Sequence, residues 1–198
     1  RLKPLIYGSV QFALGLLVEY GGVLLTCPSS SPENFFVSPE DSEKRCGVTL
    51  GSTHDLALIR QLFRNFLEIF EGDALCSRVR DALQRLPGYR IGKRGELCEW
   101  FFDYEEPPEE RHHRHISHLY GIYPADEIRS DALKQAVRRT LALRGVDNLG
   151  WAGAWRSAVY ARLGDGEAAL AYQRRGTVGV SLHPSRADST VTPSFEGN

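Results

Sequence analysis

The sequence predicts an all-α protein, and three observations support this fold class. Six segments carry apolar residues at the 3.6-residue spacing of helices. No two segments before the C-terminal tail alternate apolar and polar residues as paired strands do. The predicted helices are joined by alternately short and long loops, which is typical of an α/α toroid whose long loops gather on one rim and carry function.

Each predicted helix has a recognisable beginning or end. The first is expected as a buried helix over residues 5–20, with Gly21-Gly22 as its C-terminal stop. A polar loop over residues 28–34 follows it. The next helix begins at Ser52, where Asp55 resembles the acidic member of a capping box. The others are expected at residues 74–86, 115–120 (a short one), 131–144, 151–163 and 167–174, before an irregular tail at 175–198.

The composition is that of an ordinary globular chain. Its 198 residues are 42% hydrophobic and 25% charged, enough for one core. A net charge of −1 with dispersed Lys and Arg argues against a nucleic-acid partner. The longest apolar run, residues 12–18, is too short for a membrane span. The four cysteines form no CxxC pair, which argues against zinc and redox motifs and leaves two disulfides open.

The chain ends suggest a piece of a longer protein. The sequence begins with Arg1, contains no Met and stops at Asn198 directly after Glu-Gly. We therefore expect residues 1–198 to be part of a single domain whose N-terminal helices and C-terminal part lie outside this sequence. The absence of a signal peptide then says nothing about secretion, and the compartment stays open.

Residues 95–124 hold the densest collection of chemical groups. This stretch contains four of the six histidines, seven carboxylates and six aromatic rings. Ionisable groups interleaved with rings such as Trp100 suit a pocket that stacks an apolar face and hydrogen-bonds a polar edge, as sugar sites do.

Two carboxylates are candidates for acid catalysis. Glycosidic hydrolysis requires one protonated carboxyl and a second group that activates water. Glu33 lies in the polar loop, where the alternative is a helix start with Ser31 as N-cap and Pro32 at N1. Glu99 has an aromatic neighbour that could desolvate it and raise its pKa, and its alternative is a salt bridge to the Arg-rich segment nearby.

The histidine run allows two readings. His115 and His118 are three residues apart and share a helix face, and His113 could complete a metal-dependent enzyme. Carboxylate or thiolate ligands at defined spacing are missing, so we predict no metal and no cofactor. Arg114 and His115 suit hydrogen bonds to sugar hydroxyls better, and their alternative is a helix start neutralised by neighbouring acids.

Several short blocks together resemble glycoside hydrolase family 95, and they occur in family order over nearly the whole chain. That family comprises inverting α-1,2-L-fucosidases and some α-L-galactosidases. The blocks are Ser31-Pro32-Glu33-Asn34, Gly51-Ser52-Thr53, Gly95-Glu96-Leu97, Glu99-Trp100, Arg114-His115-Ile116-Ser117-His118-Leu119-Tyr120-Gly121-Ile122-Tyr123-Pro124, Arg144-Gly145, Gly150-Trp151 and Ala154-Trp155.

The resemblance implies a portion of an (α/α)6 barrel, the six-hairpin glycosidase toroid, with a fucosylated glycan as substrate. It matches Glu33 to the general acid, with Glu99 as second choice or as a pocket group. It implies that Arg114 and His115 bind the fucose. The expected substrate-binding set is Asn34, Trp100, Arg114, His115, His118 and Trp151.

The water-activating group of the family matches Glu196, in Phe195-Glu196-Gly197-Asn198. The family has Asp there, and the extra methylene crowds a water that must fit between carboxyls roughly 6.5–9.5 Å apart. The sequence therefore supports two hypotheses: an inverting α-L-fucosidase, or a non-catalytic carbohydrate-binding or structural helical module derived from one.

Overall fold

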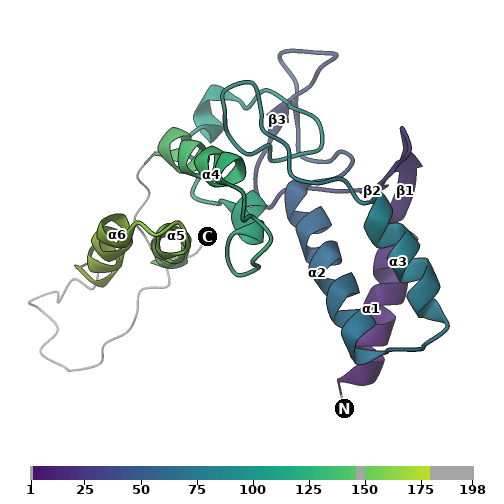
Figure 1. Cartoon of the computed structure of the whole chain (residues 1–198). Coiled ribbons are helices and arrows are strands. Elements are labelled where there is room, and N and C mark those ends of the chain that lie inside the picture. Colours follow the sequence, from purple (N-terminus) through teal and green to yellow (C-terminus); the bar gives the residue numbers. More distant parts are fainter. Residues whose placement is uncertain (1, 146–149, 179–198) are drawn as a thin grey trace, which may run out of the picture.

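The computed structural model describes residues 2–145 and 150–178, and it is mainly helical. The longer helices are α1 (Lys3–Leu16), α2 (Thr53–Ile69), α3 (Leu75–Arg85), α4 (Asp131–Arg144), α5 (Gly150–Arg162) and α6 (Gly166–Val178). In Figure 1 they form two groups, with α1, α2 and α3 on one side and α4, α5 and α6 on the other. The all-α class with six helices is thus confirmed.

The end of the first predicted helix is wrong. Helix α1 stops at Leu16, and β1 (Leu17–Tyr20) pairs antiparallel with β2 (Val23–Thr26). Gly21 and Gly22 have φ of 56° and 84° and form the two-residue turn of this hairpin. A Gly-Gly turn with two positive φ values matches the twist of paired strands, so the same dipeptide that can stop a helix closes a hairpin here.

A second strand pair was also missed, and α1 is less buried than expected. Strands β3 (Phe36–Val37) and β4 (Arg45–Cys46) form a short antiparallel ladder. Helix α1 buries one stripe, Val10, Ala13 and Leu14, and leaves Leu5 and Phe12 exposed. With only 14 residues and one partner helix, α1 has an inner and an outer face.

The other predicted helices are confirmed with small shifts. Ser52 caps α2, because its Oγ accepts the Asp55 amide at 3.1 Å, and Ser130 caps α4 in the same way. The short helix near residue 117 is the 3₁₀ helix η2 (Ser117–Gly121), and a second, η1, spans Pro108–Glu110. Helix α6 continues to Val178, four residues beyond its expected end at 174.

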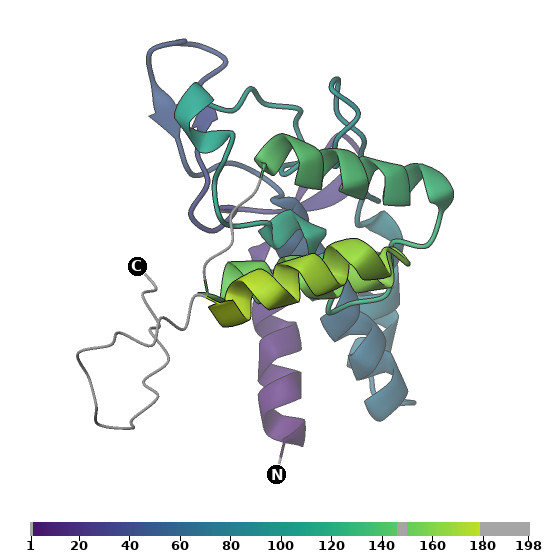
Figure 2. The same cartoon turned by 90° about the vertical axis from the view of Figure 1, so that its left-hand side faces the viewer.

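Two apolar cores hold these elements. The first joins α1, α2, α3 and β2 around Phe63 and Phe66, which are fully buried. The second joins η2, α4 and α5 around Ile116, Leu119 and Val159. Helix η2 also packs on α2 and so links the cores. Figure 2 shows α5 and α6 packed side by side in front of the other elements.

Four cysteines are free, so the two disulfides that the sequence left open are absent from this structure. Among the described residues, no helix combines the length and the apolar composition needed to cross a bilayer.

Candidate functional site

Glu33 lies on a tight turn at the surface of the protein. The turn is closed by the Asn34 amide, which donates to the Ser31 carbonyl at 2.9 Å. No helix starts here, so the reading of Ser31 as an N-cap is wrong. The Glu33 side chain is 55% exposed, as a group that must reach a substrate requires.

Two basic residues from a distant segment converge on Glu33. The Arg114 guanidinium donates to Oε2 at 2.5 Å, and His115 Nε2 lies 2.8 Å from the same oxygen. Loss of water at this carboxylate acts to raise its pKa, but the charges of His115 and Arg114 and the His115 hydrogen bond outweigh it, and the pKa is lowered from 4.5. In the ligand-free protein Glu33 is therefore a carboxylate.

Aromatic rings continue the surface beyond His115. The His115 ring lies 4.9 Å from the Trp151 indole, which in turn lies 5.3 Å from Trp155. Trp151 is the second residue of α5 and is 42% exposed, so part of its indole is accessible. One surface thus combines a carboxylate, a guanidinium, an imidazole and a partly exposed indole. Such groups are typical of sugar-binding sites.

The neighbouring His113 supports His115. The two rings stack at 5.1 Å, and the His115 backbone amide donates to His113 Nδ1 at 3.1 Å. Burial, with His115, Arg144 and Arg114 close by, lowers the pKa of His113 to about 4. His113 is consequently neutral, as the accepting role of Nδ1 requires.

A hollow of about 500 Å³ adjoins this surface. Trp155, whose ring lies 5.3 Å from that of Trp151, is one of its walls, while Trp151 itself does not line it. It is lined by His54, Tyr120, Tyr123, Pro124, Ala154, Trp155 and Ala158. This volume lies in the range of small-molecule sites, so it has room for a sugar ring.

Trp100 is not part of the exposed surface. It is only 2% exposed, and its ring packs against Phe36 at 5.2 Å and Tyr104 at 6.2 Å. The cavity it lines has about 30 Å³, which holds water but no sugar ring. Direct stacking of Trp100 on a sugar, as expected from the sequence, is contradicted by this burial.

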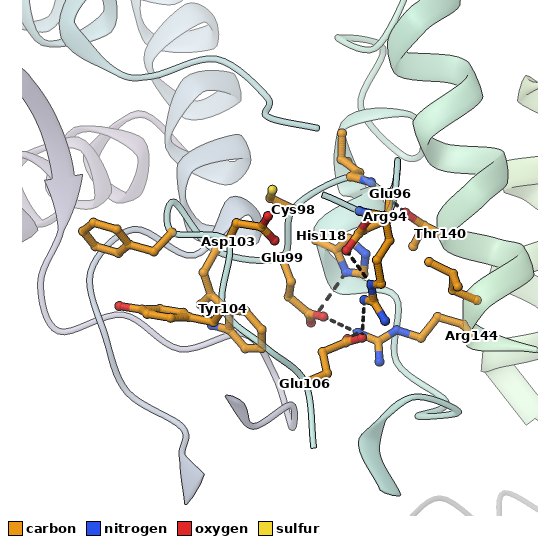
Figure 3. Close-up of a pocket in the computed structure, with 14 residues that line it drawn as sticks. Arg94, Glu96, Cys98, Glu99, Asp103, Tyr104, Glu106, His118, Thr140 and Arg144 are labelled. Carbon is orange, nitrogen blue, oxygen red and sulfur yellow. Dashed lines mark hydrogen bonds and ion pairs between the residues drawn. The ribbon is translucent and has the colours of Figure 1, made fainter. Parts of the chain in front are cut away.

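Glu99 is buried in an ion-pair network, shown in Figure 3. Its Oε1 accepts from Ser31 Oγ at 2.7 Å and from Asn34 Nδ2, and its Oε2 accepts from Arg144. His118 Nδ1 lies 3.5 Å from Oε1. Burial acts to raise the pKa of Glu99, but Arg144 first and His118 next outweigh it and hold the pKa far below 4.5.

The expected rise in the pKa of Glu99 is therefore wrong, and so is the alternative of a bridge to the nearby Arg-rich segment. Its partner is Arg144, 45 residues away at the end of α4. Both carboxyls have a lowered pKa, but Glu99 is buried whereas the Glu33 side chain is 55% exposed and can reach a substrate, so Glu33 remains the candidate acid. Asn34 and His118, expected to bind substrate, are 3% and 1% exposed and face Glu99 instead.

The network contains residues that the sequence did not single out as functional. Arg144 Nη2 also pairs with Glu106 Oε1 at 2.6 Å, and Nη1 donates to the Glu110 carbonyl at 2.7 Å. An arginine in the last turn of a helix ordinarily complements the helix dipole in water. The block Arg144-Gly145 marks this arginine in the sequence, but its place in the last turn of the helix does not indicate that it is buried, at 3% exposure, against Glu99.

Two predictions remain, the role of Glu196 and the metal reading of the histidines. Glu196 lies outside the described residues, so the structure says nothing of its place. Among residues 2–145 and 150–178, no cluster of three or more His, Cys, Asp or Glu side chains has the geometry to hold a metal ion. His115 faces Glu33 whereas His118 faces Glu99, so the histidines proposed as metal ligands engage different partners.

Comparisons with known proteins identify the family of the chain. The model of the glycosyl hydrolase family 95 catalytic domain matches residues 1–193. Alpha-L-fucosidase 2 of Arabidopsis thaliana is 39% identical over 173 residues, covering 83% of this chain and 20% of that protein. Probable alpha-fucosidase A of Aspergillus oryzae and of Aspergillus niger are each 35% identical, over 169 and 180 residues. The chain spans about a fifth of the length of these curated relatives.

Proposed function

Because this chain belongs to glycoside hydrolase family 95, we propose that it supplies the acid-bearing part of an active site that hydrolyses terminal α-L-fucosidic linkages in glycans. In this proposal the catalyst inverts the anomeric carbon in a single displacement. Glu33 protonates the glycosidic oxygen, and Glu196 activates the water on the other side of the sugar. The substrate class is taken from the three relatives named above, which are called fucosidases.

One observation carries the proposal: Glu33, Arg114, His115 and Trp151 come from three separate segments and meet at one accessible surface. Buried ion pairs alone would serve stability. Here the carboxylate is exposed, and the groups around it could hydrogen-bond one edge of a sugar. The partly exposed indole beside them could stack on one face of the same sugar.

The lowered pKa of Glu33 has a direct bearing on this mechanism. A general acid must carry its proton when the glycosidic bond breaks. In the ligand-free protein, Arg114 and His115 hold Glu33 as a carboxylate. When sugar hydroxyls take over these two donors, Glu33 loses the groups that lower its pKa. Substrate binding and protonation of the acid are then one coupled event.

The test uses 2′-fucosyllactose and two proteins: the chain itself, and a chimera in which the chain replaces the matched segment of the Arabidopsis thaliana relative. Proton NMR follows the release of L-fucose and the configuration of the first anomer formed. We expect the chimera to release β-L-fucose from the α-linked substrate. Initial release of the α-anomer would overturn inversion, and no release would overturn hydrolysis.

A second candidate is a carbohydrate-binding module without catalysis, which the ionised state of Glu33 favours. It predicts that L-fucose raises the melting temperature of the chain while the chimera hydrolyses nothing. Hydrolysis by the chimera would exclude it.

A further inference from the structure

We propose that Glu99 is the positioning residue of this site: its buried carboxylate clamps the turn that carries Glu33 and ties it to the segment that carries Arg114 and His115. This inference rests on the proposed function, because it takes Glu33 as the acid. Glu99 is buried, at 6% exposure, and its carboxylate is held by Ser31, Asn34 and Arg144, so its role is exerted through other residues.

The first support is the bracket around Glu33. Ser31 and Asn34 are anchored to the same oxygen of Glu99, with only Pro32 and Glu33 between the two anchors. Both anchoring side chains are buried, at 1% and 3% exposure. The Asn34 amide closes the turn on the Ser31 carbonyl. Glu33 is thus displayed from a turn whose two ends are fixed by one carboxylate.

The second support is the connection to the partners of Glu33. His118 lies 3.5 Å from Glu99 and follows His115 by three residues, in the helix η2. The other oxygen of Glu99 is held by Arg144, which Glu106 and the Glu110 carbonyl hold in turn. Figure 3 shows these side chains converging on Glu99 from α4, η2 and the loop before η1. One carboxylate therefore fixes both the acid and the segment that binds it.

A carboxylate is required because both of its oxygens must accept. An amide offers one accepting oxygen and one donating nitrogen. In Glu99→Gln the negative charge that holds Arg144 is lost, and the nitrogen faces either the Arg144 guanidinium or Ser31 and Asn34, whose side chains must then turn to accept from it. Either orientation weakens or rearranges the clamp. The shape of the side chain is retained, which separates the loss of acceptance from a loss of packing.

Glu127→Gln is a matched control. Glu127 is a buried carboxylate whose side chain is 7% exposed; it pairs with Arg60 at 2.8 Å and Arg64 at 2.5 Å and accepts from Tyr89 at 2.7 Å. None of these three partners belongs to the Glu33 turn. Both variants neutralise a buried, arginine-bound carboxylate, so a general loss of stability affects them alike.

The kinetic test measures kcat and KM of the chimera on 2′-fucosyllactose. A displacement of about 1 Å at a reacting group costs about 100-fold in rate. We expect Glu99→Gln to lower kcat by about that factor and to raise KM by a smaller factor, because the segment with Arg114 and His115 is also released. Glu127→Gln should leave both constants unchanged. Ser31→Ala, which removes one anchor without a change of charge, should lower kcat by a smaller factor. Equal kcat for the two glutamine variants would overturn the proposal.

A second measurement does not depend on catalysis. In the 198-residue chain, hydrogen exchange reports the Asn34 amide that closes the turn. We expect faster exchange at Asn34 in Glu99→Gln and in Ser31→Ala than in Glu127→Gln. Equal exchange in all three variants would overturn the positioning role. If the wild-type chimera releases no fucose, the proposed function fails while this measurement still decides the role of Glu99.

Discussion

His115 Nε2 lies 2.8 Å from Glu33 Oε2, although the two residues are 82 positions apart in the chain. Arg114 donates to the same oxygen at 2.5 Å. The groups expected to hold the sugar are therefore engaged with the candidate acid. A bound sugar should therefore replace Glu33 as the partner of Arg114 and His115.

Binding of L-fucose to the chain should take up a proton. The pKa of free Glu33 is below 4.5, with His115 and Arg114 as the cause that lowers it, and it should rise when sugar hydroxyls replace them. Because the bound form then holds more protons, fucose affinity should increase as the pH falls towards 4.5. Calorimetry in two buffers of different ionisation enthalpy measures the uptake. Glu33→Gln should abolish the buffer dependence, and buffer-independent heats for the wild type would contradict the coupling.

Glu33→Gln should disable the chimera on natural linkages. A positioned general acid contributes about 10²–10⁴-fold, so we expect a fall in kcat of that size on 2′-fucosyllactose. An aryl fucoside with a good leaving group needs no proton, so its hydrolysis should be affected far less. Rates on both substrates make the comparison. Equal losses on the two would assign Glu33 a role other than proton donation.

Glu99 should make stability depend on pH in acid. Its folded pKa lies far below the usual 4.5, so below that pH the unfolded chain binds more protons than the folded chain. The stabilisation is thus complete above pH 4.5 and is lost as the pH falls through the folded pKa. We expect the difference in free energy of unfolding between wild type and Glu99→Gln to narrow as the pH is lowered from 5 to 3. Urea unfolding at several pH values measures this difference. A difference that does not change with pH would contradict the lowered pKa of Glu99.

Trp100 and Trp151 should respond oppositely to replacement by alanine. Trp100 is 2% exposed, and its loss should cost about 3–5 kcal/mol of unfolding free energy. Trp151 is 42% exposed, so Trp151→Ala should change stability by less than about 0.5 kcal/mol. It should nevertheless weaken fucose binding several-fold, because the exposed part of the indole is removed. Thermal unfolding and fucose titration of both variants check the contrast.

Gly121→Ala should destabilise the junction of the two cores. A Cβ at this position would lie 2.0 Å from Tyr89 Oη and 2.4 Å from its Cζ, so the ring must move and its bond to Glu127 breaks. Overpacking of this kind costs about 1–3 kcal/mol. Gly8→Ala is the control, because its Cβ meets nothing within 4 Å on helix α1, and it should gain about 0.5–1 kcal/mol. Urea unfolding compares the two.

The helices could be predicted because their apolar spacing and caps are local. Ser52 and Ser130 cap the helices that their positions in the sequence indicated. The β1–β2 hairpin could not, because Gly21-Gly22 fits both a helix stop and a hairpin turn. Only the pairing of residues 17–20 with residues 23–26 resolves that ambiguity.

The sequence indicated which residue types form the candidate site, but not which of them face the surface and which are buried. Glu33, Arg114, His115 and Trp151 do meet, as the motif blocks suggested. Trp100, Asn34 and His118 belong to the same blocks and are buried. A motif gives the order of residue types along the chain. It does not tell which side chains point to the surface and which point into the interior.

The clamp on Glu99 also sets the order in which the protein can assemble. Its contacts close loops of 68 residues to Ser31, 65 to Asn34 and 45 to Arg144, and the His115 bond closes one of 82. The entropic cost of closing such loops is offset only after the helices at both ends have packed. On refolding, helix signals should return before the Glu33 turn becomes ordered, so sugar binding should be the last property to reappear.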